Sequence, residues 1–444
     1  MTLALAALIC VAAPLKAQTF QEGFFLKDYR LGYRINPALA GGGNFISIGE
    51  FGKNNRFNVG AGAFLYPRDG EVLTALHPSI PAETFLGKLK DQNYTYNAYN
   101  YNIFAYGFSR GEAFHTLELN VRAQYSANVP KDLFRILKLG TTDTVYDLSR
   151  ADVQGQLYAE LAYGYTRKLS DIVTVGGRAK LLVGLNAVDY RMSNLKLHLD
   201  GSEYRVDVGA ELDMTGRTRR FIPTEDGYLS LMSSTAAKWY VPTGAGLAVD
   251  LGVVVTPNEY LTLSASVLDL GAICWVFANS GQSIGTASFA GLNLAYEDLN
   301  KNALMDKLKD VGKDFLGTLK LKSMGSHAKV NMVPLRANLG FRYRIPTFEM
   351  VSFGVVASYI GYQNMPYWEA RYCMSCTPTD WLDLACSFGT GAHGGVWGIG
   401  GSVRVQRFRL NVGVEKAFGG TVGESTTPVE PQSKVVTIGL TYDL

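Results

Sequence analysis

Residues 246–267 read GLAVDLGVVVTPNEYLTLSASV, and this stretch shows most clearly how the chain is patterned. On both arms apolar side chains alternate with small, polar or charged ones, as Leu247 and Leu251 do with Asp250. A period of two is typical of a β-strand with one apolar and one polar face. The TPNE segment at 256–259 favours a reversal between the arms, because it contains Pro and Asn. The stretch predicts a hairpin whose apolar face lies against a protein core or against lipid.

The same alternation recurs along the chain. It is found in LYAELAYGYT (157–166), TVGGRAKLLVG (174–184), LRANLGFRYR (335–344) and the C-terminal VTIGLTYDL (436–444). Most of these segments place their charges on the polar face. A soluble β-sandwich shows such alternation too. The predicted strands, however, run to about ten or more residues, whereas strands of soluble proteins average about five to six.

Aromatic residues also favour a barrel in lipid over a sandwich. Tyr163, Tyr165, Tyr343 and Tyr442 fall on the apolar face near strand ends, where a transmembrane barrel carries its aromatic girdles. The whole chain has 48 Gly, 25 Tyr and 22 Phe, a composition that suits many strands and tight turns. We therefore predict an all-β fold, a closed antiparallel transmembrane β-barrel of about 14 strands.

The first residues, MTLALAALICVAAPLKAQTF, indicate export. The apolar run ends at Pro14 and Lys16, which favours a secretory signal cut after Ala17 over a buried helix. We predict a signal peptide at 1–17, an N-terminal segment at 18–42 that forms a hatch or plug, and the barrel at 43–444. A net charge of +3 gives no sign of nucleic-acid binding.

The connections between strands are of two kinds. Short reversals are predicted at GKNN (52–55), SRGE (109–112), KLSD (168–171), TPNE and IPT (345–347). Longer connections carry short amphipathic helices, which begin near IPAETF (80–85), near VPKDLF (129–134) and at Ala303. These helices either cap the barrel mouth or dock at an interface or a partner.

Charged side chains on the polar face are the candidate functional residues, because that face lines the lumen. The predicted lumen-lining residues are Glu118, Arg122, Glu160, Arg178, Lys180, Asp250, Arg336, Arg342, Arg344, Arg404, Arg409 and Glu415. They form either a salt-bridge network that braces the interior or a hydrated path biased toward anions.

The cysteines and histidines give little sign of chemistry. In an oxidising compartment Cys373, Cys376 and Cys386 are candidates for a disulfide, and Cys274 is the remaining cysteine after the predicted signal. The CMSC segment at 373–376 has the C-x-x-C spacing of one half of a zinc site, but no second pair of cysteines follows. None of the five histidines has another at helical spacing. We expect no catalytic residues, no metal and no cofactor.

Several stretches resemble a known family. GFFLKDYRLGYRINPALAGG (23–42), LHPSIPAETFLGKLK (76–90), VPKDLFRILKLG (129–140) and the region 246–275 together resemble an uncharacterised family of Bacteroidetes outer-membrane β-barrels. That family is distantly similar to FadL-type transport barrels and to barrels associated with gliding and type IX secretion. The shared short motif is Asn36-Pro37-Ala38. The resemblance implies an N-terminal hatch and a route for hydrophobic molecules.

Two functions remain open at this point. The first is a bacterial outer-membrane conduit or binder for small or hydrophobic molecules. The second is a structural or interaction barrel with a plugged lumen, which serves an envelope or secretion assembly. The expected partners are outer-membrane lipid, the barrel-assembly machinery, and a hydrophobic small molecule or an envelope protein. On the polar face of the opening hairpin, we expect Asp250 to tolerate replacement by Asn.

Overall fold

The computed structural model describes most of the chain after the predicted signal. The described residues are 21–27, 29–68, 71–140, 144–199, 204–217, 219–233, 240–289, 320–361, 367–392, 394–417 and 432–444. The predicted signal peptide at 1–17 and the predicted helix from Ala303 lie outside the described residues.

A single antiparallel sheet of seventeen strands dominates the part of the chain that is described. The sheet closes on itself, because β1 pairs with β4 along one edge and with β21 along the other. The closed path runs through β1 (Phe45–Phe57), β4 (Gln92–Arg110), β5 (Ala113–Pro130), β7 (Asp152–Lys168), β8 (Val173–Leu199), β12 (Gly244–Asn258), β13 (Leu261–Phe289), β15 (Leu335–Arg344), β16 (Val351–Gly361), β17 (Tyr367–Thr379), β18 (Leu382–Gly391), β19 (Gly394–Val405), β20 (Phe408–Ala417) and β21 (Gln432–Asp443). This ring is the transmembrane barrel.

Three strands of the sheet lie beside the closed path. They are β6 (Thr144–Asp147), β9 (Tyr204–Thr215) and β14 (Lys322–Met332), which pair with parts of β8 and β13. The sheet therefore has more strands than the number expected for the barrel. Two hairpins, β2 (Leu65–Arg68) with β3 (Glu71–Thr74) and β10 (Arg219–Pro223) with β11 (Leu229–Ser233), stand apart from it.

The four predicted reversals that fall between strands of the ring lie at one end of the barrel. Those predicted at SRGE, KLSD, TPNE and IPT are confirmed, since each falls between consecutive strands of the ring. The reversal predicted at GKNN is wrong. Residues 52–55 continue β1, which is paired along this stretch with both β4 and β21. The backbone N–H and C=O groups there pair with two neighbouring strands, and this pairing outweighs the local preference for a turn.

The opening hairpin directs its apolar face outward. Leu251 is 57% exposed on the outer face, whereas its neighbour Asp250 is 1% exposed within the barrel. Tyr163 and Tyr165 are also exposed on the outside, near the short reversals. An apolar exterior and a polar interior are the arrangement that a lipid bilayer requires of a barrel.

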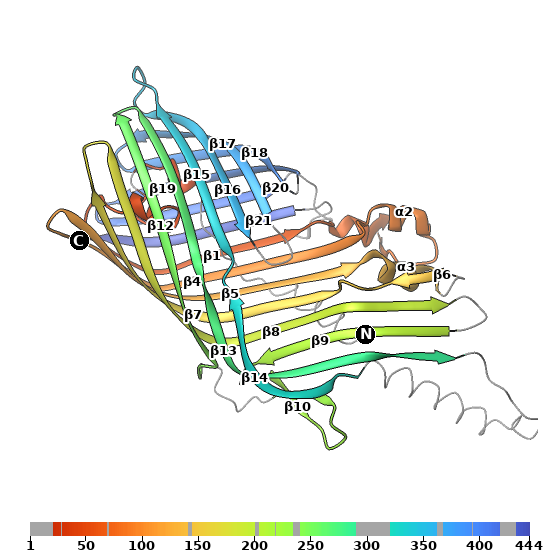
Figure 1. Cartoon of the computed structure of the whole chain (residues 1–444). Coiled ribbons are helices and arrows are strands. Elements are labelled where there is room, and N and C mark those ends of the chain that lie inside the picture. The colour runs from red at the N-terminus through yellow and green to blue at the C-terminus, as the bar shows by residue number, and fades with distance from the viewer. Residues whose placement is uncertain are drawn as a thin grey trace, which may run out of the picture.

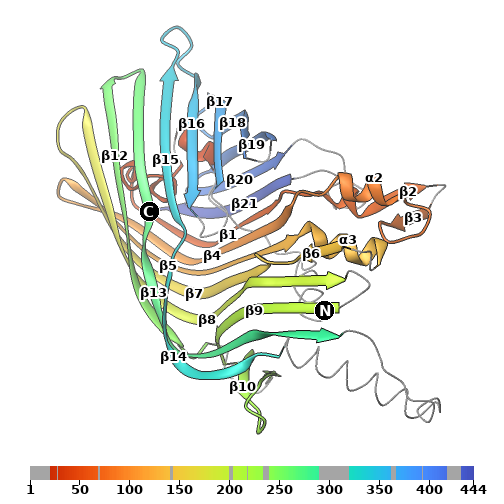
Figure 2. The ribbon, with the colours of Figure 1, turned by 45° about the vertical axis from the view of Figure 1, so that its right-hand side comes forward.

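One side of the barrel continues beyond the ring. β8 has 27 residues and β13 has 29, whereas about 9–11 residues suffice to cross a bilayer. Beyond the ring, β9 takes the place that β12 holds between these two strands. Figures 1 and 2 show the long strands extending as a curved sheet with helices at its far end. We call this part, which consists of β6, β9, β14 and the ends of β8 and β13 that pair with them, the extension.

The two predicted helices that fall on described residues are confirmed. They are α2 (Ala82–Gly87) and α3 (Lys131–Leu139). Leu133 and Ile136 of α3 pack against an apolar cluster of the extension that includes Leu195, Val206 and Val208. None of the described helices is long and apolar enough to cross a membrane.

The N-terminal residues lie inside the ring, where Figure 1 shows them as the red coil. They contain three short 3₁₀ helices, η2 (Gln21–Phe24), η3 (Gly32–Arg34) and η4 (Pro37–Leu39), and η5 (Ala61–Ala63) follows β1. We call residues 21–40 the N-terminal segment. Its apolar side chains form a buried cluster with inward residues of the wall, among them Phe45, Phe114 and Val356. The main apolar core of the barrel thus lies in its lumen.

Candidate functional site

The N-terminal segment joins a network of charged side chains through Arg34. The Arg34 guanidinium donates from Nε to Glu118 Oε1 at 2.5 Å and also pairs with Glu50. Glu118 lies on β5, where its second oxygen pairs with Arg178 of β8. All four side chains are buried. A guanidinium from the segment therefore compensates carboxylates of two wall strands.

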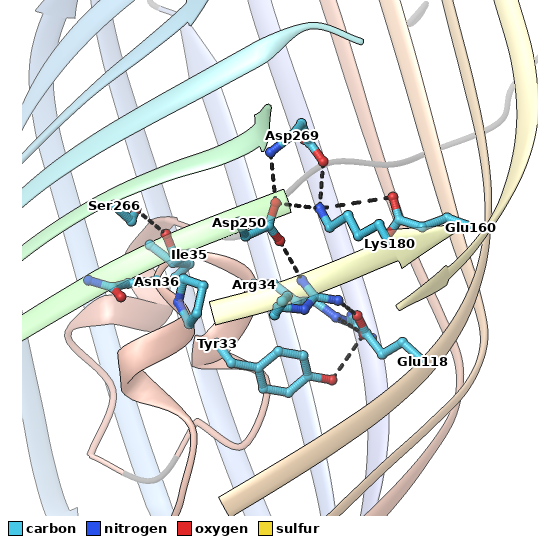
Figure 3. A network of polar contacts seen from close by, with 12 residues as sticks. Tyr33, Arg34, Ile35, Asn36, Glu118, Glu160, Lys180, Asp250, Ser266 and Asp269 are labelled. Atoms are coloured by element: carbon cyan, nitrogen blue, oxygen red, sulfur yellow. Dashed lines mark hydrogen bonds and ion pairs between the residues drawn. The ribbon is translucent and has the colours of Figure 1, made fainter. Parts of the chain in front are cut away.

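The network continues along β8 to the opening hairpin. Arg178 Nη1 donates to Asp250 Oδ2 at 3.2 Å, and Lys180 Nζ lies 2.7 Å from Asp250 Oδ1. Lys180 also lies 2.6 Å from Asp269 Oδ1. Figure 3 shows Lys180 between these two carboxylates, with Glu160 on its other side. Asp250 thus binds two cations.

Asp269 collects the remaining cations of the network. Arg122 donates to both of its oxygens, at 2.7 and 3.0 Å, and also to Glu160 Oε2 at 2.8 Å. Arg336 of β15 donates from Nε to Asp269 Oδ2 at 2.9 Å. A carboxylate with this many charge-assisted donors is fixed in position.

We call this group the central network. It contains five cations and five carboxylates, so that its charges cancel: Arg34, Arg122, Arg178, Lys180, Arg336, Glu50, Glu118, Glu160, Asp250 and Asp269. Buried charges are tolerated when each finds a partner of opposite sign. The pairing agrees with a bracing role for these residues.

Tyr33 adds a neutral donor to the network. Its hydroxyl donates to Glu118 Oε1 at 2.9 Å, as Figure 3 shows. Burial, with the Glu118 carboxylate as a further cause, raises the pKa of Tyr33 well above its usual range. The Tyr33 hydroxyl therefore stays protonated and remains a donor.

Asn36 and Pro37 fasten the segment to β7, β12 and β13, strands that also carry residues of the central network. The Asn36 amide nitrogen lies 2.9 Å from the carbonyl of Val253 and 2.8 Å from the hydroxyl of Ser264. The Asn36 oxygen accepts from the backbone N–H of Ala38 at 2.9 Å, which caps η4. Thr166 donates to the Pro37 carbonyl at 2.7 Å. The Asn-Pro-Ala motif is thus the docking turn of the segment.

Two glycines of the wall make room for this turn. A Cβ on Gly176 would lie 2.3 Å from the Pro37 carbonyl carbon, and a Cβ on Gly252 would lie 1.9 Å from the Asn36 side-chain oxygen. Gly177 is the next residue on β8 and points the other way, with no atom nearer than 3.6 Å to its added Cβ. Any side chain at position 176 therefore conflicts with the docked segment.

A second charged group holds the start of the segment. Glu22 Oε1 accepts from Arg371 Nη1 at 3.0 Å and from the Ser387 hydroxyl. Arg371 also pairs with Glu369 at 3.1 Å and Glu415 at 2.5 Å. We call Glu22, Glu369, Arg371 and Glu415 the Glu22 cluster. Arg56 acts on Glu369 as a second nearby cation, so that three carboxyl groups face two cations here.

The structure places most of the predicted lumen residues inside the barrel. Eight are buried: Glu118, Arg122, Glu160, Arg178, Lys180, Asp250, Arg409 and Glu415. Four are partly exposed: Arg336, Arg342, Arg344 and Arg404. Of the eight buried residues, six belong to the central network and Glu415 belongs to the Glu22 cluster. Arg409 pairs instead with Asp443 at 3.1 Å. Arg342 donates to the Phe24 carbonyl at 3.0 Å, and Arg344 lies near the short reversals.

Sequence parity missed several residues of the site. Asp269 falls on the outward parity of its strand, but a register shift between β12 and β13 turns it inward, with a positive φ of 62°. Glu50 follows a similar shift in β1 after Ile48. A β-bulge adds one residue and reverses the faces beyond it, and no sequence signal marked either bulge. Gly49 has a positive φ of 72° at the bulge in β1, but one glycine in a glycine-rich chain does not mark a bulge in advance.

The predicted disulfide is absent from the structure. Cys373, Cys376 and Cys386 are all free, and so is Cys274. Cys373 faces the lumen while Cys386 is exposed, so these two lie on opposite faces of the sheet. Within the described ranges no group of three His, Cys, Asp or Glu could hold a metal ion.

Two recesses lie on either side of the segment. One, of about 730 Å³, lies at the short reversals and is lined by Phe24, Leu39 and Phe114 among others. The other is much smaller, about 50 Å³, lies toward the extension and is lined by Arg34, Arg122 and other residues of the central network. The segment and the central network separate them.

One family model and several solved structures are similar to this chain. The model of a family of unknown function (DUF5723) matches residues 40–415. No curated protein matches the chain. Among solved structures, the Ralstonia pickettii toluene transporter TbuX is 9% identical, with 93% of each chain covered and a TM-score of 0.47. A Pseudomonas aeruginosa FadL homologue is 10% identical, with 97% of this chain and 100% of that chain covered and a TM-score of 0.45.

The Pseudomonas putida toluene transporter TodX is a third similar structure, 10% identical, with 92% of each chain covered and a TM-score of 0.42. The similarity to FadL-type barrels that the sequence suggested is thus found among solved structures. All three TM-scores lie below 0.5, and the strand pairings alone establish the closed ring described above.

Proposed function

Because this chain belongs to DUF5723, a family of unknown function, we propose its function from the geometry of its lumen. It is an outer-membrane conduit for small molecules, and its N-terminal segment is the hatch that closes the path. The predicted segment boundaries at 18–42 and the lumen-lining side chains belong to this proposal.

The observation that carries the proposal is how the segment is held. Its polar contacts to the wall are hydrogen bonds and ion pairs, through Glu22, Arg34 and Asn36. A wide recess lies on its short-reversal side and a narrow one on its extension side. A plug that filled the lumen rigidly would leave no such space. A hatch, in contrast, must be held by non-covalent contacts that water molecules can replace when it opens.

The orientation follows from the loops. Short turns of outer-membrane barrels commonly face the periplasm and long connections face outward. The C-terminal residue lies at the end with the predicted short reversals. Leu444 N–H donates to the Asn44 carbonyl at 3.0 Å, and the Asn44 side chain accepts from the N–H of Ser109 in the SRGE reversal at 2.8 Å. We place this end in the periplasm and the extension outside. Phe24, Leu39 and Phe114 then line the inner recess, which favours cargo with an apolar part.

Solute flux into proteoliposomes tests the conduit. Wild type and a variant without residues 21–40 are compared for the entry of a small sugar, a small anion and toluene. The proposal predicts slow entry through the wild type and faster entry through the variant. Both proteins must show the heat-modifiable gel mobility of a folded barrel. A folded variant that admits all three solutes no faster than the wild type contradicts the proposal.

The extension favours a second candidate function, an interaction barrel for an envelope or secretion assembly. Strands of 27 and 29 residues build a platform that conduction does not require. Leu137 and Leu139 of α3 are exposed on it. Crosslinking in intact cells tests this function with wild type and a Leu137→Arg variant. A partner captured by the wild type and lost in the variant supports it, and a chain recovered alone in both counts against it.

A further inference from the structure

The wider of the two recesses beside the N-terminal segment combines an apolar wall with positive charge. Its volume of about 730 Å³ lies within the range of small-molecule sites, about 300–1,000 Å³. The recess lies at the end of the barrel that carries the predicted short reversals. Phe24 and Leu39 of the segment form its apolar wall together with Phe114 of β5. A ligand in this recess would contact both the segment and the ring.

The described residues that line the recess include more cations than carboxylates. The charged lining residues are Lys27, Arg30, Arg167, Lys168, Arg342 and Glu112. Arg167 pairs with Glu112 at 2.6 Å, and both side chains are exposed. Arg30 pairs with Asp443 at 2.9 Å. Lys27 lies 3.9 Å from an exposed aspartate, a pair that water screens.

Lys168 and Arg342 have no carboxylate within ion-pair distance among the residues that the structure describes. Lys168 is the last residue of β7 and is exposed in the recess. Arg342 lies near the end of β15, where it donates to the neutral Phe24 carbonyl at 3.0 Å. Exposed carboxylates of the neighbouring turns, such as Glu349 at 3.9 Å, pair with Arg344 instead. The recess therefore contains two uncompensated positive charges.

Two uncompensated cations favour a ligand that carries two negative charges. A phosphomonoester carries about 1.5–2 negative charges at pH 7, whereas a carboxylate carries one. Lysine and arginine are also the usual partners of phosphate in proteins. Inorganic phosphate would leave the apolar wall of Phe24, Leu39 and Phe114 without a contact. An organic group attached to the phosphate would pack against this wall and bury its apolar surface.

We propose that this recess is a binding site for a small phosphomonoester with an apolar organic group. Lys168 and Arg342 compensate the charge of the phosphate, and the organic group lies against Phe24, Leu39 and Phe114. Because the docked segment supplies part of the wall, the site exists only while the segment is in place. That the bound ester is a cargo of the conduit rests on the proposed function.

Titration calorimetry with phenyl phosphate tests the site on the full-length protein, in a non-ionic detergent and a buffer without phosphate. We expect phenyl phosphate to bind at least about tenfold more tightly than benzoate, which carries one charge, and than inorganic phosphate, which has no ring. Binding should weaken from about pH 7.5 to about pH 5, because the second pKa of a phosphomonoester lies near about 6 and the ligand loses one charge.

Two variants remove the uncompensated charges one at a time. Lys168→Gln and Arg342→Gln should each weaken the binding of phenyl phosphate about tenfold, the effect of losing one charged partner. Arg342 also holds the Phe24 carbonyl, whereas Lys168 has no such contact with the segment among the described residues. Lys168→Gln is therefore the variant that leaves the segment docked.

Arg404→Gln is the matched control. Arg404 is a partly exposed arginine of β19 at the same end of the barrel, and it is not among the residues that line the recess. This variant should bind phenyl phosphate like the wild type, because the general positive charge of this end does not form the site. If the Lys168 and Arg342 variants bind as well as the control, the proposal is wrong.

The comparison of ligands can also overturn the proposal. A wild type that does not bind phenyl phosphate has no such site. Benzoate that binds as tightly would show that one negative charge is sufficient, and inorganic phosphate that binds as tightly would show that the apolar wall has no part in binding. Either result contradicts a phosphomonoester site.

The binding measurement does not depend on flux, so that the two proposals can fail separately. Binding that is lost in Lys168→Gln supports the site even if removal of residues 21–40 fails to increase flux. Conversely, an open conduit whose wild type does not bind phenyl phosphate leaves the proposed function standing and removes the phosphomonoester site.

Discussion

The central network and the Glu22 cluster hold the same segment in opposite ways. In the central network the segment contributes a cation, Arg34, to a group whose charges cancel. In the Glu22 cluster it contributes a carboxylate, Glu22, to a group that already contains Glu369 and Glu415. The Arg34 contact completes a group with equal numbers of cations and carboxylates. The Glu22 contact adds a carboxyl group to a cluster that already has more carboxyl groups than cations. Burial of a charged pair alone therefore does not show which contact holds the segment.

Removal of Arg34 should have the largest effect. Arg34→Met leaves Glu50 without its partner in this network and should weaken docking of the segment by about 3–5 kcal/mol, the cost of breaking a buried ion pair. The barrel itself should remain folded. Limited proteolysis measures the change as faster cleavage within residues 21–40. Cleavage at the wild-type rate would mean that Arg34 does not hold the segment.

A change on the lipid face separates the wall from the segment. Leu251→Arg should destabilise the barrel by about 2–4 kcal/mol if position 251 lies at the bilayer midplane. The segment should stay as resistant to protease as in the wild type, in those barrels that fold. Urea unfolding in lipid vesicles measures the stability. A protein that is soluble without detergent would disprove the membrane assignment itself.

The structure revises the expectation for Asp250. The sequence suggested that Asn would be tolerated there, but the carboxylate binds Arg178 and Lys180 and also accepts from the Asp269 N–H at 2.7 Å. Asp250→Asn should therefore cost about 1–3 kcal/mol, since it removes the charge from hydrogen bonds to charged donors. Urea unfolding next to the wild type measures it. An unchanged unfolding midpoint would restore the original expectation.

Replacement of Glu22 should have the smallest effect. In Glu22→Gln the lost attraction to Arg371 is offset by relief of the repulsion from Glu369 and Glu415. The stability of docking should change by less than about 1 kcal/mol, the scale of a single net hydrogen bond. The same proteolysis assay applies. Cleavage as fast as in Arg34→Met would show that the two groups hold the segment equally.

The sequence predicted the wall better than it predicted the site. Alternation was sufficient to orient Leu251 and Asp250, because each strand has only two faces. It failed at Asp269 and Glu50, where bulges reverse the faces without any marker in the local sequence. It also left out Glu369 and Arg371, whose importance comes from Glu22, more than 340 residues away. Such a contact depends on packing that no short pattern contains.

The most direct test of the hatch uses two adjacent glycines of β8. A side chain at 176 meets the backbone of Pro37 and Ala38, whereas one at 177 points outward. Gly176→Leu and Gly177→Leu are therefore matched variants that differ in the face they alter.

Conductance of single proteins in planar bilayers is the measurement. If the docked segment closes the lumen, wild type and Gly177→Leu stay closed, and Gly176→Leu conducts because the segment is displaced. Equal conductance of the two variants, or a Gly176→Leu protein that is folded and closed, would contradict the claim that this segment is the hatch.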